Sequence, residues 1–133
     1  MTESLRVATF NASLNRAASG ELIENLSGSD DPQARRVAEI IQRNAPDVLL
    51  VNEFDFDPAG EAARLFQTNY LGVSQNGQAP IEYPYVYAVP SNTGVPTGFD
   101  LDNDGSVGGP GDAQGFGAFE GQFAFVIYSK YPI

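Results

Sequence analysis

Two side chains that can bind a metal ion or a phosphate group follow short apolar stretches of this sequence. Glu53 comes just after the apolar run 48–51, and Asn11 directly follows Phe10. A carboxylate at the end of a buried strand lies where open α/β sheets bind ligands, and it can hold a divalent cation. An amide at the matching end of a neighbouring strand can donate to a phosphate oxygen or accept from a metal-bound water. The alternatives are a solvated acidic residue for Glu53 and a turn-forming residue for Asn11.

A second set of oxygen ligands lies in a glycine-rich stretch. Asp100, Asp102 and Asp104, followed by a glycine, have the spacing of the first half of a calcium-binding loop. The twelfth position of that pattern, which should be a glutamate, is Gly111, and Asp112 is one place late. The stretch is therefore a candidate Ca²⁺ site, and a disordered acidic loop is the alternative.

Composition limits the chemistry that the chain can perform. The 133 residues include 7 Lys and Arg against 17 Asp and Glu, for a net charge of −10, with no His and no Cys. Disulfides, thiol catalysis, cysteine-based zinc sites and histidine bases are excluded, so a bound metal would take oxygen ligands, as Mg²⁺ and Ca²⁺ do. A surface that binds phosphates without sequence preference is not expected. No apolar run approaches the roughly 18 residues of a membrane span.

The first half of the chain reads as a strand, a helix and a second strand. A β-favouring stretch around 5–10 ends at Asn11, and the range 16–29 is expected to be loop with at most a helical turn. Asp30 or Asp31 can cap a helix that opens at Pro32 and stops before Pro46. The apolar run after it predicts a buried parallel strand, and this βαβ order brings the ends of both strands, with Asn11 and Glu53, into one crevice.

The second half predicts one more helix and two more strands. The helix is expected to be capped by Asp57, to open at Pro58 and to end near 70–72, with strands over 83–89 and 122–129. Between them, residues 90–117 form a long Gly- and Asp-rich loop. The fold class is therefore α/β, a mixed β-sheet flanked by helices in one domain. An unpaired final strand would favour self-association.

Three blocks of the sequence closely resemble the endonuclease/exonuclease/phosphatase superfamily, which has the DNase I-like fold. The blocks are 7–11, 46–53 and 121–133, in that order. The resemblance implies that residues 1–133 form about half of an αββα sandwich. It also implies that Glu53 ligates Mg²⁺ or Mn²⁺, that Asn11 orients phosphate or metal, and that the substrate is a phosphate ester. A nuclease, a phosphoinositide phosphatase and other phosphoesterases all fit these parts.

The later blocks of that superfamily, an Asp–Asn pair and an Asp–His pair, have no counterpart here. We therefore expect the chain to be the N-terminal portion of a phosphoesterase, inactive as it stands, with the C-terminal half as its missing partner. The alternative is a non-catalytic, calcium-dependent binding or adhesion module. The acidic loop, which is similar to insertions in bacterial extracellular members, favours a secreted or periplasmic protein. No signal peptide is visible, and a cytoplasmic location stays open.

Overall fold

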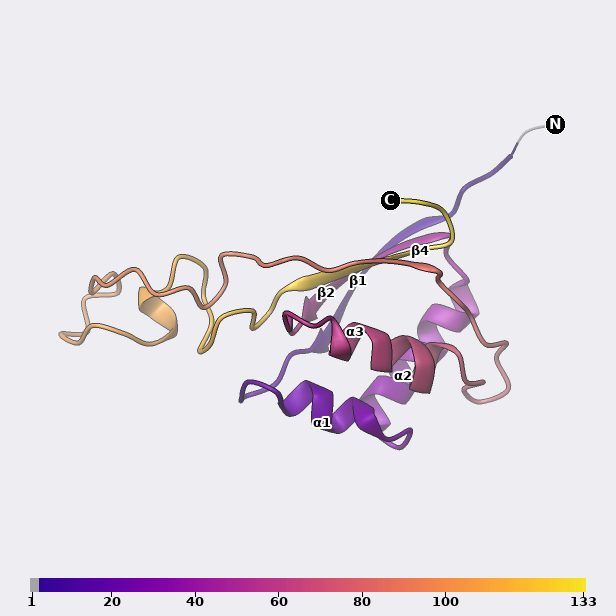
Figure 1. The fold of residues 1–133 in the computed structure, drawn as a ribbon, viewed down its shortest axis with the longest axis horizontal. Helices are drawn as coiled ribbons and strands as arrows, with labels where there is room; N and C mark the ends of the chain where they lie inside the picture. The colour runs from indigo at the N-terminus through magenta and orange to yellow at the C-terminus, as the bar shows by residue number, and fades with distance from the viewer. Residues whose placement is uncertain (1–2) are drawn as a thin grey trace.

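A four-stranded sheet with helices packed on one of its faces forms the body of the molecule (Figure 1). The computed structural model describes residues 3–133. The strands are β1 (Val7–Leu14), β2 (Val48–Phe54), β3 (Tyr85–Tyr87) and β4 (Phe125–Ser129). The helices are α1 (Glu21–Ser27), α2 (Pro32–Asn44) and α3 (Glu61–Phe66), with a π-helical turn η1 (Gln67–Leu71) and a 3₁₀ turn η2 (Pro110–Asp112).

The sheet is mixed, as the sequence predicts. Its strand order is β1-β2-β4-β3. β1 and β2 run parallel, and the helices α1 and α2 lie between them in the chain. β4 runs antiparallel to both of its neighbours, β2 and β3. The βαβ unit and the α/β fold class are therefore confirmed, and the carboxyl ends of β1 and β2 lie at one edge of the sheet.

Helix α2 begins and ends where its flanking residues require. Asp31 is the N-cap, and its Oδ1 accepts a hydrogen bond of 2.7 Å from the backbone N–H of Ala34. Pro32 occupies the first turn, where a missing N–H costs nothing. The helix stops at Ala45, which adopts a left-handed conformation (φ 44°) before Pro46. Its buried stripe faces the sheet and η1: Ala34, Val37, Ala38 and Ile41.

Two other helices differ from the sequence prediction. The range 16–29, expected to be loop, contains α1, because Leu22 and Leu26 lie one turn apart and are both buried. The next helix begins at Glu61 rather than at Pro58. Asp57 still stabilises the first turn of this helix, because its carboxylate accepts hydrogen bonds from the N–H groups of Glu61 (2.8 Å) and Ala62 (2.9 Å).

The strands also differ in their bounds. β1 continues past Asn11 to Leu14, and the expected strands over 83–89 and 122–129 shorten to β3 and β4. Tyr83 precedes β3 and is buried, and its hydroxyl donates to the carbonyl of Pro46 (2.8 Å). The prediction of an unpaired final strand is wrong. β4 is hydrogen-bonded to β2 on one side and to β3 on the other, so the two outermost strands are β1 and β3.

The two faces of the sheet have different surroundings. One face packs on the helices through residues that include Leu49, Val51, Val126 and Tyr128, each at most 1% exposed. The other, which we call the open face, carries Val7, Leu50, Phe125, Ile127, Tyr85 and Tyr87, placed by the strand register. Tyr85 and Tyr87 are 41% and 44% exposed. All three helices lie on the opposite side of the sheet (Figure 1), so no described helix covers the open face.

Residues 90–121 form a long projection from the sheet, which we call the arm (Figure 1, orange to yellow). The arm replaces the expected loop over 90–117 with a doubled-back chain held by isolated bridges, Thr93 with Gly115 and Pro96 with Ala113. The backbone hydrogen bonds from Gly94 to Gly115 and from Gln114 to Val95, both 2.8 Å, join its two limbs.

None of the helices described for residues 3–133 combines the length and the hydropathy needed to cross a bilayer.

Candidate metal and phosphate site

A β-bulge turns Glu53 toward the first strand. Asn11 pairs with Asn52, but the next aligned pair is Leu14 with Phe54, so two residues of β1 lie opposite Glu53 alone. Regular alternation after Val51 would place Glu53 on the helix side and Phe54 on the open face. With the bulge, Phe54 is 3% exposed in the core and Glu53 leaves the helix side. Bulges of this kind re-aim side chains next to active sites.

Ser13 lies between the two residues that the sequence singled out. Its Oγ donates to Oε2 of Glu53 (3.2 Å), and its backbone N–H donates to Oδ1 of Asn11 (3.2 Å). Asn11 and Glu53 therefore lie at the same spot, the carboxyl edge of the parallel pair, as expected. Ser13 is not among the residues that the sequence patterns indicate. Only its two-residue distance from Asn11 could have signalled it.

The bulge carries backbone strain at both of its key residues. Ser13 has φ 53° and Glu53 has φ 55°, in the left-handed region that residues other than glycine rarely adopt. Such conformations cost of order 1–3 kcal/mol and concentrate at functional sites. The surrounding contacts must hold both residues in place.

A network of buried hydrogen bonds behind the bulge holds these residues in place. The carboxylate of Asp55, 6% exposed, accepts from the backbone N–H of Arg16 (2.7 Å) and of Phe123 (3.1 Å). The amide of Gln122 donates to the Arg16 carbonyl and accepts from the Ala118 N–H, both at 2.6 Å. We call these residues, Arg16, Asp55, Gln122 and Phe123, the anchor. It ties the loop after β1, the end of β2 and the base of the arm together.

The Arg16 side chain extends the anchor into the helical layer. The side chain is 11% exposed, and its guanidinium contacts Oδ1 of Asn25 (2.5 Å), Oε1 of Gln33 (3.1 Å) and Oδ2 of Asp31 (3.5 Å). Gln33 in turn donates to the carbonyl of Ser13 (2.7 Å). Gln33, at the start of α2, is therefore bonded both to the Arg16 side chain and to the backbone of the bulge.

Burial raises the pKa of Asp55 above its ordinary value. The backbone N–H groups of Arg16 and Phe123 act in the opposite direction because they stabilise the carboxylate, but desolvation is the larger effect. The anchor therefore contains an acid whose charged form is costly in the folded chain.

Three acidic residues of the arm form a cluster in which Asp112 stands where the sequence predicts Asp104. One carboxylate oxygen each from Asp100, Asp102 and Asp112 lies within 4.8 Å of the others, so this cluster could hold a metal. Asp112 is 2% exposed, and the N–H groups of Leu101 and Gly108 hold its pKa below the usual range. Asp104 is not in this cluster, and its Oδ1 accepts from the N–H of Ser106 (2.8 Å).

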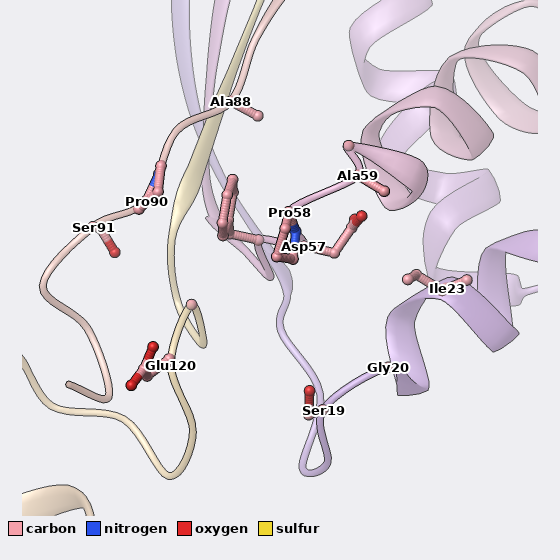
Figure 2. A pocket seen from close by; sticks show the side chains of 13 residues that line it. Ser19, Gly20, Ile23, Asp57, Pro58, Ala59, Ala88, Pro90, Ser91 and Glu120 are labelled. Carbon is pink, nitrogen blue, oxygen red and sulfur yellow. The ribbon is translucent and has the colours of Figure 1, made fainter. Parts of the chain in front are cut away.

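A separate hollow of about 840 Å³ lies at the same edge of the sheet but on the helix side (Figure 2). Ser19 and Ile23 border it from the start of α1, and Ser91 and Glu120 from the base of the arm. Asp57 also lines it, but both of its carboxylate oxygens are engaged by α3. Asn11, Ser13 and Glu53 do not line this hollow, so it is distinct from the site at the bulge.

Comparison with known proteins identifies the family. The endonuclease/exonuclease/phosphatase family pattern matches residues 8–133, nearly the whole chain. The chain belongs to the endonuclease/exonuclease/phosphatase family. Its matched region begins in β1 and includes the bulge, the anchor, the arm and β4. Neither the search of curated proteins nor the search of solved structures gave a match.

The donor set at the bulge suits the metal ions on which this family typically depends. Glu53 offers a carboxylate and Asn11 an amide oxygen, and Ser13 contacts both. Hard divalent cations take oxygen ligands, and Mg²⁺ in particular is bound through one or two carboxylates, with waters and substrate phosphate completing its coordination. The single carboxylate of Glu53, with the amide of Asn11 beside it, fits that requirement.

Proposed function

We propose that this chain supplies Glu53 and Asn11 to the active site of a divalent-metal-dependent phosphoesterase. The observation that carries the proposal is the bulge, which turns Glu53 from the helix side of the sheet to a position where Ser13 connects it to Asn11. Family membership supports a phosphoester substrate. Glu53 is the proposed ligand of Mg²⁺ or Mn²⁺.

The reaction assigns a distinct task to each residue. The bound cation, when present, would polarise the phosphate and stabilise the charge on the leaving oxygen. Asn11 donates from its amide to a phosphate oxygen and fixes the orientation of the ester. Water adds to phosphorus, the P–O ester bond breaks, and the alcohol leaves with a proton. Because the sequence contains no histidine, we propose that residues outside it activate the water and that the isolated chain is inactive.

Metal binding at the bulge can be tested residue by residue. Amide NMR spectra recorded during a Mn²⁺ titration should show paramagnetic broadening of residues 11–14 and 53, separately from any broadening in the arm. Glu53→Gln should abolish the broadening at the bulge because it removes the carboxylate charge. The matched control is Glu82→Gln, an exposed glutamate before β3. Broadening of residues 11–14 that persists in Glu53→Gln would refute the assignment.

A calcium-dependent binding module is the second candidate function. It is favoured by the close approach of Asp100, Asp102 and Asp112 in the arm. A Ca²⁺ titration followed by calorimetry tests it, with Asp102→Asn expected to weaken binding and Glu53→Ala expected to leave it unchanged. If Ca²⁺ produces no heat and no NMR shifts in residues 100–112, this candidate fails and the phosphoesterase proposal stands alone.

A further inference from the structure

The cationic side chains of residues 3–133 are bonded elsewhere than to the candidate ligands, although Arg16 lies behind the bulge in the anchor. Arg6 and Lys130 lie at the opposite edge of the sheet, where Lys130 pairs with Asp47 (3.2 Å). Two arginines on the helices are paired with acidic neighbours, Arg43 with Glu39 and Arg64 with Glu61.

The three other arginines are in the helical layer or bound to it. Arg35 and Arg36 line a hollow on α2 beside Gln75, and the guanidinium of Arg16 is enclosed by Asp31 and Asn25. These seven side chains are all the Lys and Arg residues of the sequence, and all lie in the described range. None makes a hydrogen bond or ion pair to the side chains of Asn11, Ser13 or Glu53.

The charged side chains of the arm are all negative, and most lie out along the projection rather than at its base. It contains Asp100, Asp102, Asp104, Asp112 and Glu120, and residues 88–124 include no Lys or Arg. Its base is fixed close to Glu53. The N–H of Phe54 donates to Ala124 (3.0 Å), and the N–H of Phe56 donates to Gly121 (2.9 Å). The anchor adds further bonds at the same place. An all-acidic projection therefore starts within a few residues of the candidate ligand.

This charge distribution disfavours the binding of a nucleic-acid polymer. Proteins that bind nucleic acid gain most of their sequence-independent affinity from Lys and Arg contacts to phosphates, which release condensed counterions. A duplex carries one negative charge per roughly 1.7 Å of its axis. Phosphates that ran beside the arm would face carboxylates and no Lys or Arg side chain. A small ester has one or two negative charges, which a single divalent cation can balance.

We propose, resting on the phosphoesterase function above, that the substrate is a small-molecule phosphoester and that the acidic arm excludes polymeric nucleic acid. The arm is then a specificity element: it selects by repulsion of the polyanion and leaves the metal-bound phosphate group unaffected. Discrimination by repulsion of the wrong ligand is a general route to specificity.

A binding experiment tests the proposal without requiring turnover. Fluorescence anisotropy would compare a labelled nucleoside monophosphate with a short labelled DNA duplex, in Mg²⁺ and without Ca²⁺, since Ca²⁺ in the arm would cancel part of its charge. The mononucleotide should bind in a Mg²⁺-dependent way that Glu53→Gln abolishes, and the duplex should bind at least about tenfold more weakly.

Two triple variants, one in the arm and one elsewhere, test whether the position of the acidic residues matters or only the net charge of the chain. Asp100→Asn, Asp102→Asn and Asp104→Asn together should raise duplex affinity at least about tenfold and leave mononucleotide affinity unchanged. The matched control neutralises three exposed, unpaired acids elsewhere, Glu24→Gln, Asp30→Asn and Glu82→Gln, and should leave duplex affinity nearly unchanged.

The outcomes distinguish the two proposals. Duplex binding that is tighter than mononucleotide binding and falls steeply with salt overturns the specificity role of the arm but leaves the phosphoesterase function standing. Equal gains in duplex affinity in both triple variants show that only net charge matters, and also overturn it. If neither probe binds in a way that depends on Mg²⁺ and Glu53, the phosphoesterase proposal itself fails, and the substrate assignment fails with it.

Discussion

At the scale of single residues, Ser13 combines a strained backbone with contacts to both candidate ligands. We expect Ser13→Gly to weaken Mn²⁺ binding at the bulge about three- to tenfold, because a hydrogen bond to Glu53 worth about 1 kcal/mol is lost. Stability should change little, because the backbone strain that glycine relieves at φ 53° offsets the lost hydrogen bond. Ser13→Ala should weaken Mn²⁺ binding equally but also lower the unfolding temperature. Unchanged Mn²⁺ affinity in both variants would show that the hydroxyl does not position Glu53.

Asp55 should leave a signature in the pH dependence of stability. Its pKa is raised in the folded chain, so the folded state binds more protons than the unfolded state just above the ordinary aspartate pKa. Its contribution therefore lowers the free energy of unfolding as pH rises through that window, by less than about 1.4 kcal/mol per pH unit. In Asp55→Asn this contribution disappears, and the slope against pH becomes more positive.

Asp55→Asn should also cost stability at neutral pH. The two carboxylate oxygens of Asp55 each accept from a backbone N–H, whereas an asparagine has one oxygen and leaves one donor facing its amide group. Chemical denaturation across pH measures both effects. Identical slopes in the wild type and Asp55→Asn would contradict the burial-driven pKa.

The sequence predicts that Asn11 and Glu53 lie together at one edge of the sheet, but it does not predict the geometry that joins them. Both follow apolar strands, and that pattern places them at one edge of the sheet. Simple alternation, however, would put Glu53 on the same face as Val51. The extra residue in β1 depends on the pairing of two strands about 40 positions apart, and no local pattern encodes it. Asp112 joins the arm cluster for the same kind of reason, through loop closure rather than spacing.

At the scale of elements, the N-cap of α2 supports both the helix and the anchor. Asp31→Ala should lower the free energy of unfolding by more than the roughly 1 kcal/mol of an ordinary cap, because the enclosed guanidinium of Arg16 also loses a partner. Urea unfolding measures the change. Asp30→Ala is the matched control, since this exposed neighbour makes no capping contact. Equal losses in the two variants would show that the cap contributes nothing specific.

Helix α2 and strand β2 were predictable because their signals are local. A capping aspartate, a proline in the first turn and an apolar stripe fix α2, and an uninterrupted apolar run fixes the start of β2. Helix α1 was missed because it has only seven residues, and its stability comes from packing of Leu22 and Leu26 rather than from caps. The position of β4 inside the sheet was missed because strand order follows from tertiary pairing.

At the scale of the whole molecule, the open face is an apolar surface that no described helix covers. We expect residues 1–133, produced without the C-terminal half proposed above, to self-associate through this face rather than through the final strand, since large exposed apolar patches mark interaction surfaces. Ile127→Lys, in the middle of the open face beside Leu50 and Tyr87, should give a monomer with little loss of stability. Light scattering measures the mass.

Val126→Lys provides the contrast for that experiment. Val126 is fully buried on the helix side of the same strand, so a lysine there should unfold the chain. A wild-type chain that is monomeric at micromolar concentration would contradict self-association through the open face. Loss of folding in Ile127→Lys would show that Ile127 belongs to the core.

The hydrogen bonds of the anchor can form only late in the synthesis of residues 1–133. Asn11 and Glu53 leave the ribosome early, but Gln122 bonds to Arg16 across 106 positions, and Phe123 to Asp55 across 68. Contacts of such long sequence separation form late and slow the folding of the domain. A nascent chain that has not reached β4 therefore carries both candidate ligands without the bonds that hold the bulge. The metal binding proposed above would begin only once β4 has been made.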